Sequence, residues 1–448
     1  MGQRARILTE ILGFDGWKVK EAFFESKSGA RVVPIGTLAL VRETRLVVVV
    51  ERRWLARCSA CGRPCRKAHD TKQATRRWKD LPWAEHPMEI EYAPVRVRCK
   101  ACGATPVEMV AWAEPYQRQT RRLQHRLAVE AASMPIMHVA GLHGLAWTTV
   151  RRAEEHAIAR WEATRAAPAL RMIGVDEKWL GRRHKLDHKY VTIVSDLETG
   201  EPVWLGKGRS AKTLAQWLKS LSREQKANVK LFAMDMHRAF WNAVDQTRGF
   251  EHAAIVHDPF HVMKLANGAV DEVRRQIFFR GGPELRALGR GSRWLFIRAW
   301  ERTSDAQKAE LTALLAQNRT LARAYQIKEE LRAVLRAPTK EALAAGLGRI
   351  LRRTARRDNK PLRRVHDTLN ERWNELLALA EHRPPVGRIE ALNNNWETLV
   401  RRARGYRNYP YLLRKLRFMV ANPIRSQDGI RRFLALGVAP PLPHSAAA

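Results

Sequence analysis

Two aspartates occupy matching places in the sequence, each at the end of a short apolar run. Asp176 ends the run MIGVD, and Asp235 ends the run KLFAMD. If these runs form neighbouring strands, both carboxylates project from the same edge of the sheet and can share metal ions. Carboxylate oxygens are the ligands that Mg²⁺ prefers, and two such ions support in-line displacement at a phosphodiester. A single aspartate at a strand end is more often a turn or capping residue, so the prediction depends on both positions together.

A third acid would complete such a site, and a predicted helix near the C-terminus offers two. Glu390 and Glu397 are seven residues apart, so they lie on one face of that helix. Either residue can supply the third carboxylate. Glu397 also stands four residues before Arg401, a spacing that is typical of an intrahelical ion pair.

The cysteines predict a separate metal site. Four of the five cysteines form two Cys-x2-Cys pairs that are separated by 37 residues, and a glycine follows each pair. The four are Cys58, Cys61, Cys99 and Cys102. Zinc takes four thiolates in a tetrahedron, and the following glycine lets each turn tighten. We therefore expect one structural Zn²⁺ in a small ribbon with Cys65 as a non-ligand; ordinary buried thiols are the alternative.

The two aspartates require strands to position them. From Met172 the pattern alternates in the order β-β-β-α-β-α-β, and DLETG forms a hairpin loop that carries a turn glycine. From Pro259 to about Arg383 almost the whole pattern is helical. The helix with Glu390 follows and ends near residue 405. These elements predict a mixed sheet interrupted by a large helical insertion.

The N-terminal part of the chain has a different pattern. Residues 1–115 are typical of short strands and turns, and the β-branched run VVVVE predicts a strand. In the helical segment that follows, a helix from about Ile136 breaks near 141–144, and a second helix begins near Trp147. This arrangement places an exposed first turn in a major groove, and packing within a core is the alternative. The candidate DNA contacts are Thr148, Thr149, Arg151 and Arg152.

The composition indicates an anionic partner. Lysine and arginine number 81 against 45 acidic residues, and the formal net charge is +36. Such self-repulsion weakens a compact fold unless a polyanion relieves it, so nucleic acid is the first candidate. No apolar run of membrane-spanning length and no secretory signal is apparent, so we expect no membrane partner and a cytoplasmic, nucleoid-associated protein.

Taken in order, these motifs resemble the bacterial insertion-sequence transposases of the ISL3 family. The resemblance rests on CSACGRPC, RCKACG, GVDEKW, HKYVTIVSDLETG, MDMHRAFWNAV, HDPFHVMKLANGAVDEVRR and GRIEALNNNWETLVRRARGYRN. It implies a multidomain α+β or α/β protein with a zinc ribbon, a helix-turn-helix and a ribonuclease H-like DDE core built on a five-stranded mixed sheet. It also implies the catalytic triad Asp176, Asp235 and Glu390, which would hold two Mg²⁺ (or Mn²⁺) ions. Glu397 is then better explained as the ion-pair partner of Arg401.

The resemblance assigns further residues. Asp258 and His261 are expected to shape the site. Basic residues around the catalytic helix are expected to contact DNA, with a solvated basic face as the alternative for the last four, and they are Arg388, Arg401, Arg402, Arg404 and Arg407. One departure is that Asn395, Trp396 and Glu397 stand where the family usually has lysines, which affects DNA contacts rather than chemistry. The helical spacing of the insertion's tryptophans predicts core positions for Trp294, Trp300 and Trp373.

The expected domains follow the same order. They are a zinc-ribbon domain (1–115), a helix-turn-helix segment (116–165), the first part of the catalytic core (170–277), a helical insertion (278–383), the last helix of the core with its basic tail (384–425) and a C-terminal tail (426–448). The expected function is Mg²⁺-dependent cleavage and strand transfer of double-stranded DNA at terminal inverted repeats, with further contacts to target DNA, by a homodimer. The competing interpretations are a catalytically inactive DNA-binding regulator and a nonspecific ribonuclease H-like nuclease.

Overall fold

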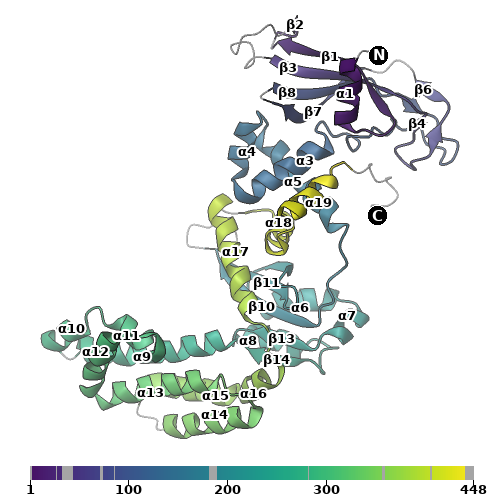
Figure 1. The fold of residues 1–448 in the computed structure, drawn as a ribbon. Coiled ribbons are helices and arrows are strands. Elements are labelled where there is room, and N and C mark those ends of the chain that lie inside the picture. Colours follow the sequence, from purple (N-terminus) through teal and green to yellow (C-terminus); the bar gives the residue numbers. More distant parts are fainter. Residues whose placement is uncertain are drawn as a thin grey trace. The chain divides into compact units, whose positions relative to one another are not determined.

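The computed structural model describes residues 3–26, 28–32, 44–70, 74–84, 86–180, 189–280, 282–355, 359–403 and 406–438. The chain divides into two compact units, and Figure 1 labels their elements. The first unit combines Met1–Ala166 with Glu397–Ala448, and the second is Ala167–Trp396. Helix α17 (Gly387–Ala403) begins in the second unit, and its last turns belong to the first.

The first unit begins with a five-stranded sheet. Its strand order is β2-β1-β3-β8-β7, and helix α1 (Gln3–Leu12) packs against β1. The strands are β1 (Trp17–Ser26), β2 (Arg31–Val32), β3 (Thr44–Arg52), β7 (Arg76–Trp83) and β8 (His86–Tyr92). The predicted strand VVVVE lies within β3, where buried valines join a core built around Trp17, Trp78 and Trp112. Two short pairs of strands flank the two Cys-x2-Cys turns: β4 (Ala56–Arg57) with β5 (Pro64–Cys65), and β6 (Ala68–Asp70) with β9 (Arg96–Val97).

Helices complete the first unit. They are α3 (Arg121–Ser133), α4 (Ile136–Leu142), α5 (Trp147–Glu162), α18 (Tyr409–Ala421) and α19 (Gln427–Ala435). The predicted break between two helices is confirmed, since Gly144 in the connection has φ +55°. A buried network joins α18 to α5: Lys415 Nζ donates to Glu154 Oε1 at 2.7 Å, and the Tyr411 hydroxyl donates to the other oxygen of Glu154. The C-terminal helices are therefore part of the same core as α3 and α5.

The second unit contains the predicted five-stranded mixed sheet. Its order is β12-β11-β10-β13-β14, with antiparallel pairing among the first three strands and parallel pairing of β10 with β13 and of β13 with β14. The strands are β10 (Met172–Trp179), β11 (Tyr190–Asp196), β12 (Pro202–Lys207), β13 (Leu231–Met234) and β14 (Ala254–His257). The expected helices are α6 (Ala211–Ser220) and α8 (Arg238–Asp245), and a short helix, α7 (Arg223–Asn228), is additional. Buried apolar residues of β10, β13, α6 and α8 form the core of this sheet.

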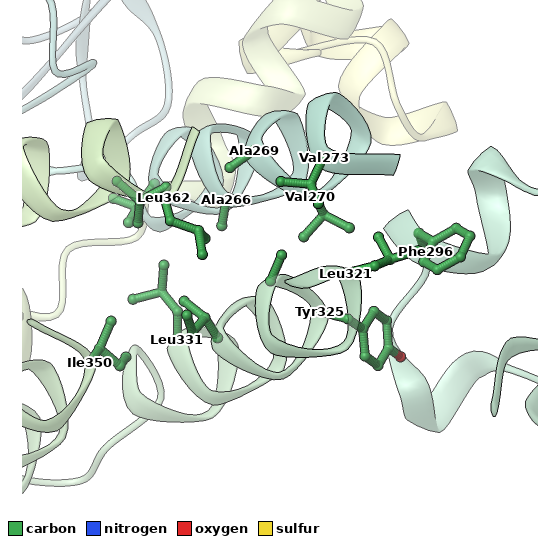
Figure 2. Packing of buried hydrophobic residues seen from close by; sticks show 14 of the residues in the cluster. Ala266, Ala269, Val270, Val273, Phe296, Leu321, Tyr325, Leu331, Ile350 and Leu362 are labelled. Carbon is green, nitrogen blue, oxygen red and sulfur yellow. The ribbon is translucent and has the colours of Figure 1, made fainter. Parts of the chain in front are cut away.

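The helical insertion has its own core. Its helices are α9 (Pro259–Arg280), α10 (Pro283–Gly289), α11 (Arg293–Ile297), α12 (Asp305–Ala316), α13 (Arg319–Val334), α14 (Lys340–Thr354), α15 (Lys360–Glu371) and α16 (Trp373–His382). Figure 2 shows small side chains of α9, such as Ala266 and Val270, facing larger ones of α13, such as Leu331. Among the described residues, no helix is both long and apolar enough to cross a bilayer.

The prediction for the tryptophans of the insertion is only partly confirmed. Trp373 is partly buried against the insertion core, as expected. Trp294 and Trp300 are 64% and 38% exposed, so the prediction was wrong for these two. They lie in a five-residue helix and in a single 3-10 turn (Trp300–Arg302), and such short elements do not continue the face that a helical spacing assumes.

Candidate active site and zinc site

The two predicted aspartates lie side by side in the second unit. Strand β10 pairs in parallel with β13, and the last paired residues are Val175 and Met234. Asp176 and Asp235 each follow directly, so the sheet places them next to each other. Asp176 does not end its strand as predicted, because β10 keeps its antiparallel pairing with β11 as far as Trp179. What ends at Asp176 is only the pairing with β13.

Glu390 reaches the same place from the first turn of α17. The helix is held on the sheet by Ile389, which packs with Leu197 and Ala233. Gly174 of β10 makes room for this contact, since a Cβ there would lie 3.2 Å from the Ile389 side chain and only 2.6 Å from Ser195 Oγ. All three acids line one pocket of about 490 Å³.

Two of the acids have defined hydrogen-bond partners. Asn393 Nδ2 donates to Asp176 Oδ2 at 2.6 Å. Asp235 Oδ1 accepts from the backbone N–H of Met236 at 2.6 Å, and its Oδ2 lies 3.3 Å from His261 Nδ1. No role for Asn393 was predicted from the sequence. Its position three residues after Glu390, on the same helical face, was the available signal.

Asp258 is a further carboxylate in this pocket, which Glu177 also lines. It follows β14, the next parallel strand after β13, and it is 9% exposed. Burial raises the pKa of Asp258 above its usual range, and the nearby charges of Asp176 and Asp235 raise it further, while His261 opposes the shift. Its Oδ1 accepts from the N–H of Phe260 at 2.9 Å and so holds the start of α9. The expected site-shaping pair therefore lies beside the two aspartates.

Arg388 holds the catalytic helix to the sheet. Its guanidinium donates to the carbonyl oxygen of Leu197 at 2.7 Å and also to that of Glu198. Both acceptors lie in or beside the hairpin between β11 and β12. Because these bonds fix the residue that precedes Ile389 and Glu390, Arg388 positions the third acid.

The four predicted cysteines form a compact group in the first unit. Their sulfurs all lie within 4.8 Å of one another, and among the described residues they are the group of possible ligands that meets this distance. Cys58 Sγ is 3.7 Å from Cys102 Sγ, and Cys61 Sγ is 3.5 Å from Cys99 Sγ. Sulfurs bound to one tetrahedral Zn²⁺ at about 2.3 Å lie about 3.8 Å apart, so the residues fit zinc.

The turns of this group have the expected form. Gly62 and Gly103 have φ +74° and +71°, and each donates its N–H to the first cysteine of its pair. Hydrogen bonding from the backbone of Cys102 lowers the pKa of the Cys99 thiol to about 6, whereas burial raises the pKa of the Cys58 thiol to about 12. In the metal-free group Cys99 is therefore the thiol that ionises more readily. Cys65 is buried outside this group, with its Sγ 3.6 Å from the carbonyl oxygen of Arg63.

Comparison with known proteins identifies the family. A model of ISL3-type DDE transposases, described as a transposase, matches residues 173–416, more than half of the chain. The chain belongs to the ISL3 family of transposases. The helix-turn-helix domain of transposase family ISL3 matches residues 108–158, and the zinc-finger of transposase IS204/IS1001/IS1096/IS1165 matches residues 54–102. The predicted family, the multidomain fold class and the enzyme class are thereby confirmed.

This transposase is similar along most of its length to curated relatives. It is 28% identical over 366 residues to the transposase for insertion sequence element IS1001 of Bordetella parapertussis, which covers 80% of this chain and 87% of the relative. It is also 28% identical over 434 residues to the transposase for insertion sequence element IS1557 of Mycobacterium tuberculosis (strain ATCC 25618 / H37Rv), covering 91% of this chain and 93% of that one.

The predicted DNA contacts of the helix-turn-helix lie in the first turns of α5. Thr148 and Arg152 are exposed and four residues apart, so they share a face. Thr149 is half-buried. Arg151 is engaged within the protein: Nη1 lies 3.0 Å from Glu155, and the guanidinium stacks over Trp147 and Tyr411. This geometry leaves Thr148 and Arg152 as the better-placed pair for an external partner.

The basic residues after Glu390 are less uniform than predicted. Arg401 is 82% exposed and pairs with Glu397 at 3.2 Å, which confirms the ion pair expected for Glu397. Arg402 donates to the carbonyl oxygen of Ala132 in the first unit, whereas Arg407 is exposed. Arg404 lies outside the described residues.

Proposed function

We propose that Asp176, Asp235 and Glu390 bind two Mg²⁺ (or Mn²⁺) ions and that the transposase uses them to cleave and rejoin DNA. The convergence of these three acids on one pocket, from two parallel strands and a distant helix, is the observation that supports the proposal. When bound, such ions activate the attacking oxygen and stabilise the leaving oxygen of an in-line displacement.

The protein's own groups prepare this pocket. Asn393 holds one oxygen of Asp176 and leaves the other for a ligand. Asp235 is held at both oxygens, with the Met236 N–H on Oδ1 and His261 on Oδ2. Arg388 fixes the start of α17 and with it Glu390. Asp258 lies buried beside both aspartates and offers a further carboxylate oxygen to a divalent ion.

The reaction proceeds in two displacements. In the first, water attacks phosphorus at an end of the element, and the bond to the 3′ oxygen breaks, which leaves a 3′-hydroxyl and a 5′-phosphate. In the second, the freed 3′-hydroxyl attacks a phosphodiester of the target DNA. A new phosphodiester forms, and the 3′ oxygen of the target strand leaves. Neither step needs a covalent bond to the protein.

Recognition of the element belongs to the first unit in this proposal. Thr148, Thr149 and Arg152 would read the terminal inverted repeats from α5, and Arg401 and Arg407 would contact the DNA backbone. One structural Zn²⁺ on the four cysteines would hold the ribbon together. Because two element ends must be brought together, we also propose that a homodimer acts, in the bacterial cytoplasm and on the nucleoid.

The test is Mg²⁺-dependent cleavage and strand transfer on DNA that carries the element's terminal repeats. Asp176→Ala, Asp235→Asn and Glu390→Gln are expected to abolish both steps but to leave binding to the repeats. Glu397→Gln, on the same face of the same helix, is the matched control and is expected to stay active. Binding without cleavage by the wild type would indicate a regulator, and cleavage that ignores the repeats would indicate a nonspecific nuclease.

A further inference from the structure

Two large aromatic side chains remain exposed where they line the acidic pocket. Phe260 is 62% exposed and Trp179 is 55% exposed. Rings of this size are normally buried, and exposed ones that gather at a functional pocket mark a binding surface. The pocket therefore offers its ligand apolar ring faces as well as carboxylates.

Phe260 is held close to the predicted catalytic residues. Its N–H donates to Asp258 Oδ1 at 2.9 Å, in the first turn of α9. Its ring packs edge-on against the ring of His261, with centroids 5.8 Å apart and an interplanar angle of 86°. His261 in turn lies 3.3 Å from Asp235. An unbroken series of contacts thus connects the exposed ring to a carboxylate of the site.

The charges around these rings suit one kind of occupant. Lys178 and Lys264 line the same pocket and can pair with phosphate oxygens. Carboxylates for metal ions, cations for phosphates and open aromatic faces for stacking together match a nucleotide within a DNA strand. In a duplex the faces of each base are covered by its neighbours, so a protein ring can stack only on a base that has left the helix.

We propose that Phe260, together with Trp179, stacks on an unpaired nucleobase next to the scissile phosphate, so that the DNA strand enters the pocket with that base splayed out of the duplex. This inference rests on the proposed function, since it assumes that the three acids process a phosphodiester. It assigns Phe260 as a residue that positions the substrate strand.

The first experiment measures single-turnover cleavage of terminal-repeat DNA by Phe260 variants. Stacking of one base on an aromatic side chain corresponds to a loss of about 5- to 140-fold when the ring is removed. We expect such a loss for both Phe260→Ala and Phe260→Leu, because leucine keeps the apolar character without the ring face. Phe260→Trp is expected to retain activity. Phe279→Ala is the matched control, since it removes a partly exposed aromatic from the same helix, and its cleavage rate is expected to be unchanged.

A second experiment links the ring to a particular base. Abasic sites are placed one at a time at the nucleotides that flank the scissile phosphate, and wild type and Phe260→Ala are compared on each DNA. At one position the abasic site is expected to slow cleavage by the wild type as much as Phe260→Ala does on intact DNA. The same abasic site is expected to slow Phe260→Ala no further, so the two effects do not add. In addition, 2-aminopurine placed at the nucleotide next to that position is expected to become brighter on binding to the cleavage-deficient Asp235→Asn protein, because its stacking neighbour has left the duplex, and to stay quenched when Phe260→Ala is added.

The outcomes separate this inference from the proposed function. If wild type does not cleave at the repeats at all, the proposed function fails. If wild type cleaves but the alanine, leucine and tryptophan variants are equal, or the penalty of Phe260→Ala persists at every abasic site, stacking is overturned alone. A lower melting temperature of Phe260→Ala with unchanged 2-aminopurine emission would also overturn it, because the ring would then be supporting the fold.

Discussion

Asn393 provides the sharpest test of how the pocket is prepared. It donates to Asp176 Oδ2 at 2.6 Å from a position one helical turn beyond Glu390. A hydrogen bond to a charged group contributes about 1.5–3 kcal/mol. If that amount is needed to hold Asp176 in its productive orientation, Asn393→Ala slows cleavage by about 10- to 160-fold.

The assay is single-turnover cleavage measured over a range of Mg²⁺ concentrations and pH. Asn393→Ala is expected to need more Mg²⁺ for half-maximal rate, because Asp176 is no longer pre-oriented. Asn393→Asp places a second carboxylate beside Asp176, and a like charge raises the pKa of its neighbour. The acid limb of the pH–rate profile is therefore expected to move to higher pH, which a merely structural role would not produce.

Asn395→Ala is the matched control, since Asn395 is on the same helix but is not among the residues that line the pocket. Its rate and Mg²⁺ dependence are expected to equal those of the wild type. If Asn393→Ala behaved like this control, the reasoning that Asn393 orients a metal-binding carboxylate would be refuted.

Four further predictions concern the zinc site, the first unit, DNA binding and pH. Metal analysis is expected to find one zinc per chain, and Cys99→Ser to lose it; a folded, metal-free wild type would end the zinc assignment. Lys415→Met leaves the buried Glu154 carboxylate without its cation and is expected to lower the free energy of unfolding by about 3–5 kcal/mol in denaturant unfolding. Adding Glu154→Gln is expected to recover part of that loss, and an unchanged unfolding midpoint of Lys415→Met would contradict the buried network. Each neutralised phosphate contributes roughly −0.9 to the slope of log affinity against log salt concentration, so Arg152→Ala is expected to make that slope shallower by about that amount. A slope equal to that of the wild type would show that Arg152 contacts no phosphate. The pKa of Asp258 is higher in the folded protein than in the unfolded chain, so this group lowers the free energy of unfolding as pH rises through the window between the two pKa values. Without Mg²⁺ and near neutral pH, Asp258→Asn is therefore expected to unfold at a higher denaturant concentration than the wild type, and the difference is expected to vanish towards pH of about 3. An equal difference at all pH values would reject this origin.

Several features of this transposase could be predicted from local sequence. The two Cys-x2-Cys pairs with their glycines, the order of strands and helices after Met172 and the paired helices around Gly144 all follow from spacing and turn residues. These features depend on interactions between residues a few positions apart, which side-chain periodicity and backbone geometry already constrain. The pairing of Glu397 with Arg401 is of the same kind.

Other features depended on contacts between distant segments. Nothing near Asp176 indicates that pairing with β13 ends just before this residue while pairing with β11 continues to Trp179, because both limits are set by the neighbouring strands. The roles of Asn393 and Arg388 appear only when α17 is laid on the sheet, more than 190 residues beyond the groups that they contact. Likewise, Tyr411 and Lys415 belong with α5 because Glu154 is buried against them.

Local pattern therefore decided which residues form elements and which of them carry metal-binding chemistry. Tertiary structure decided which elements meet, and with that which side chains serve the site. The physical reason is that a strand or helix can bury its apolar face against many partners, and the choice depends on complementary surfaces from the whole chain. Exposed Phe260 and Trp294 make the same point, since neither exposure follows from the residues that flank them.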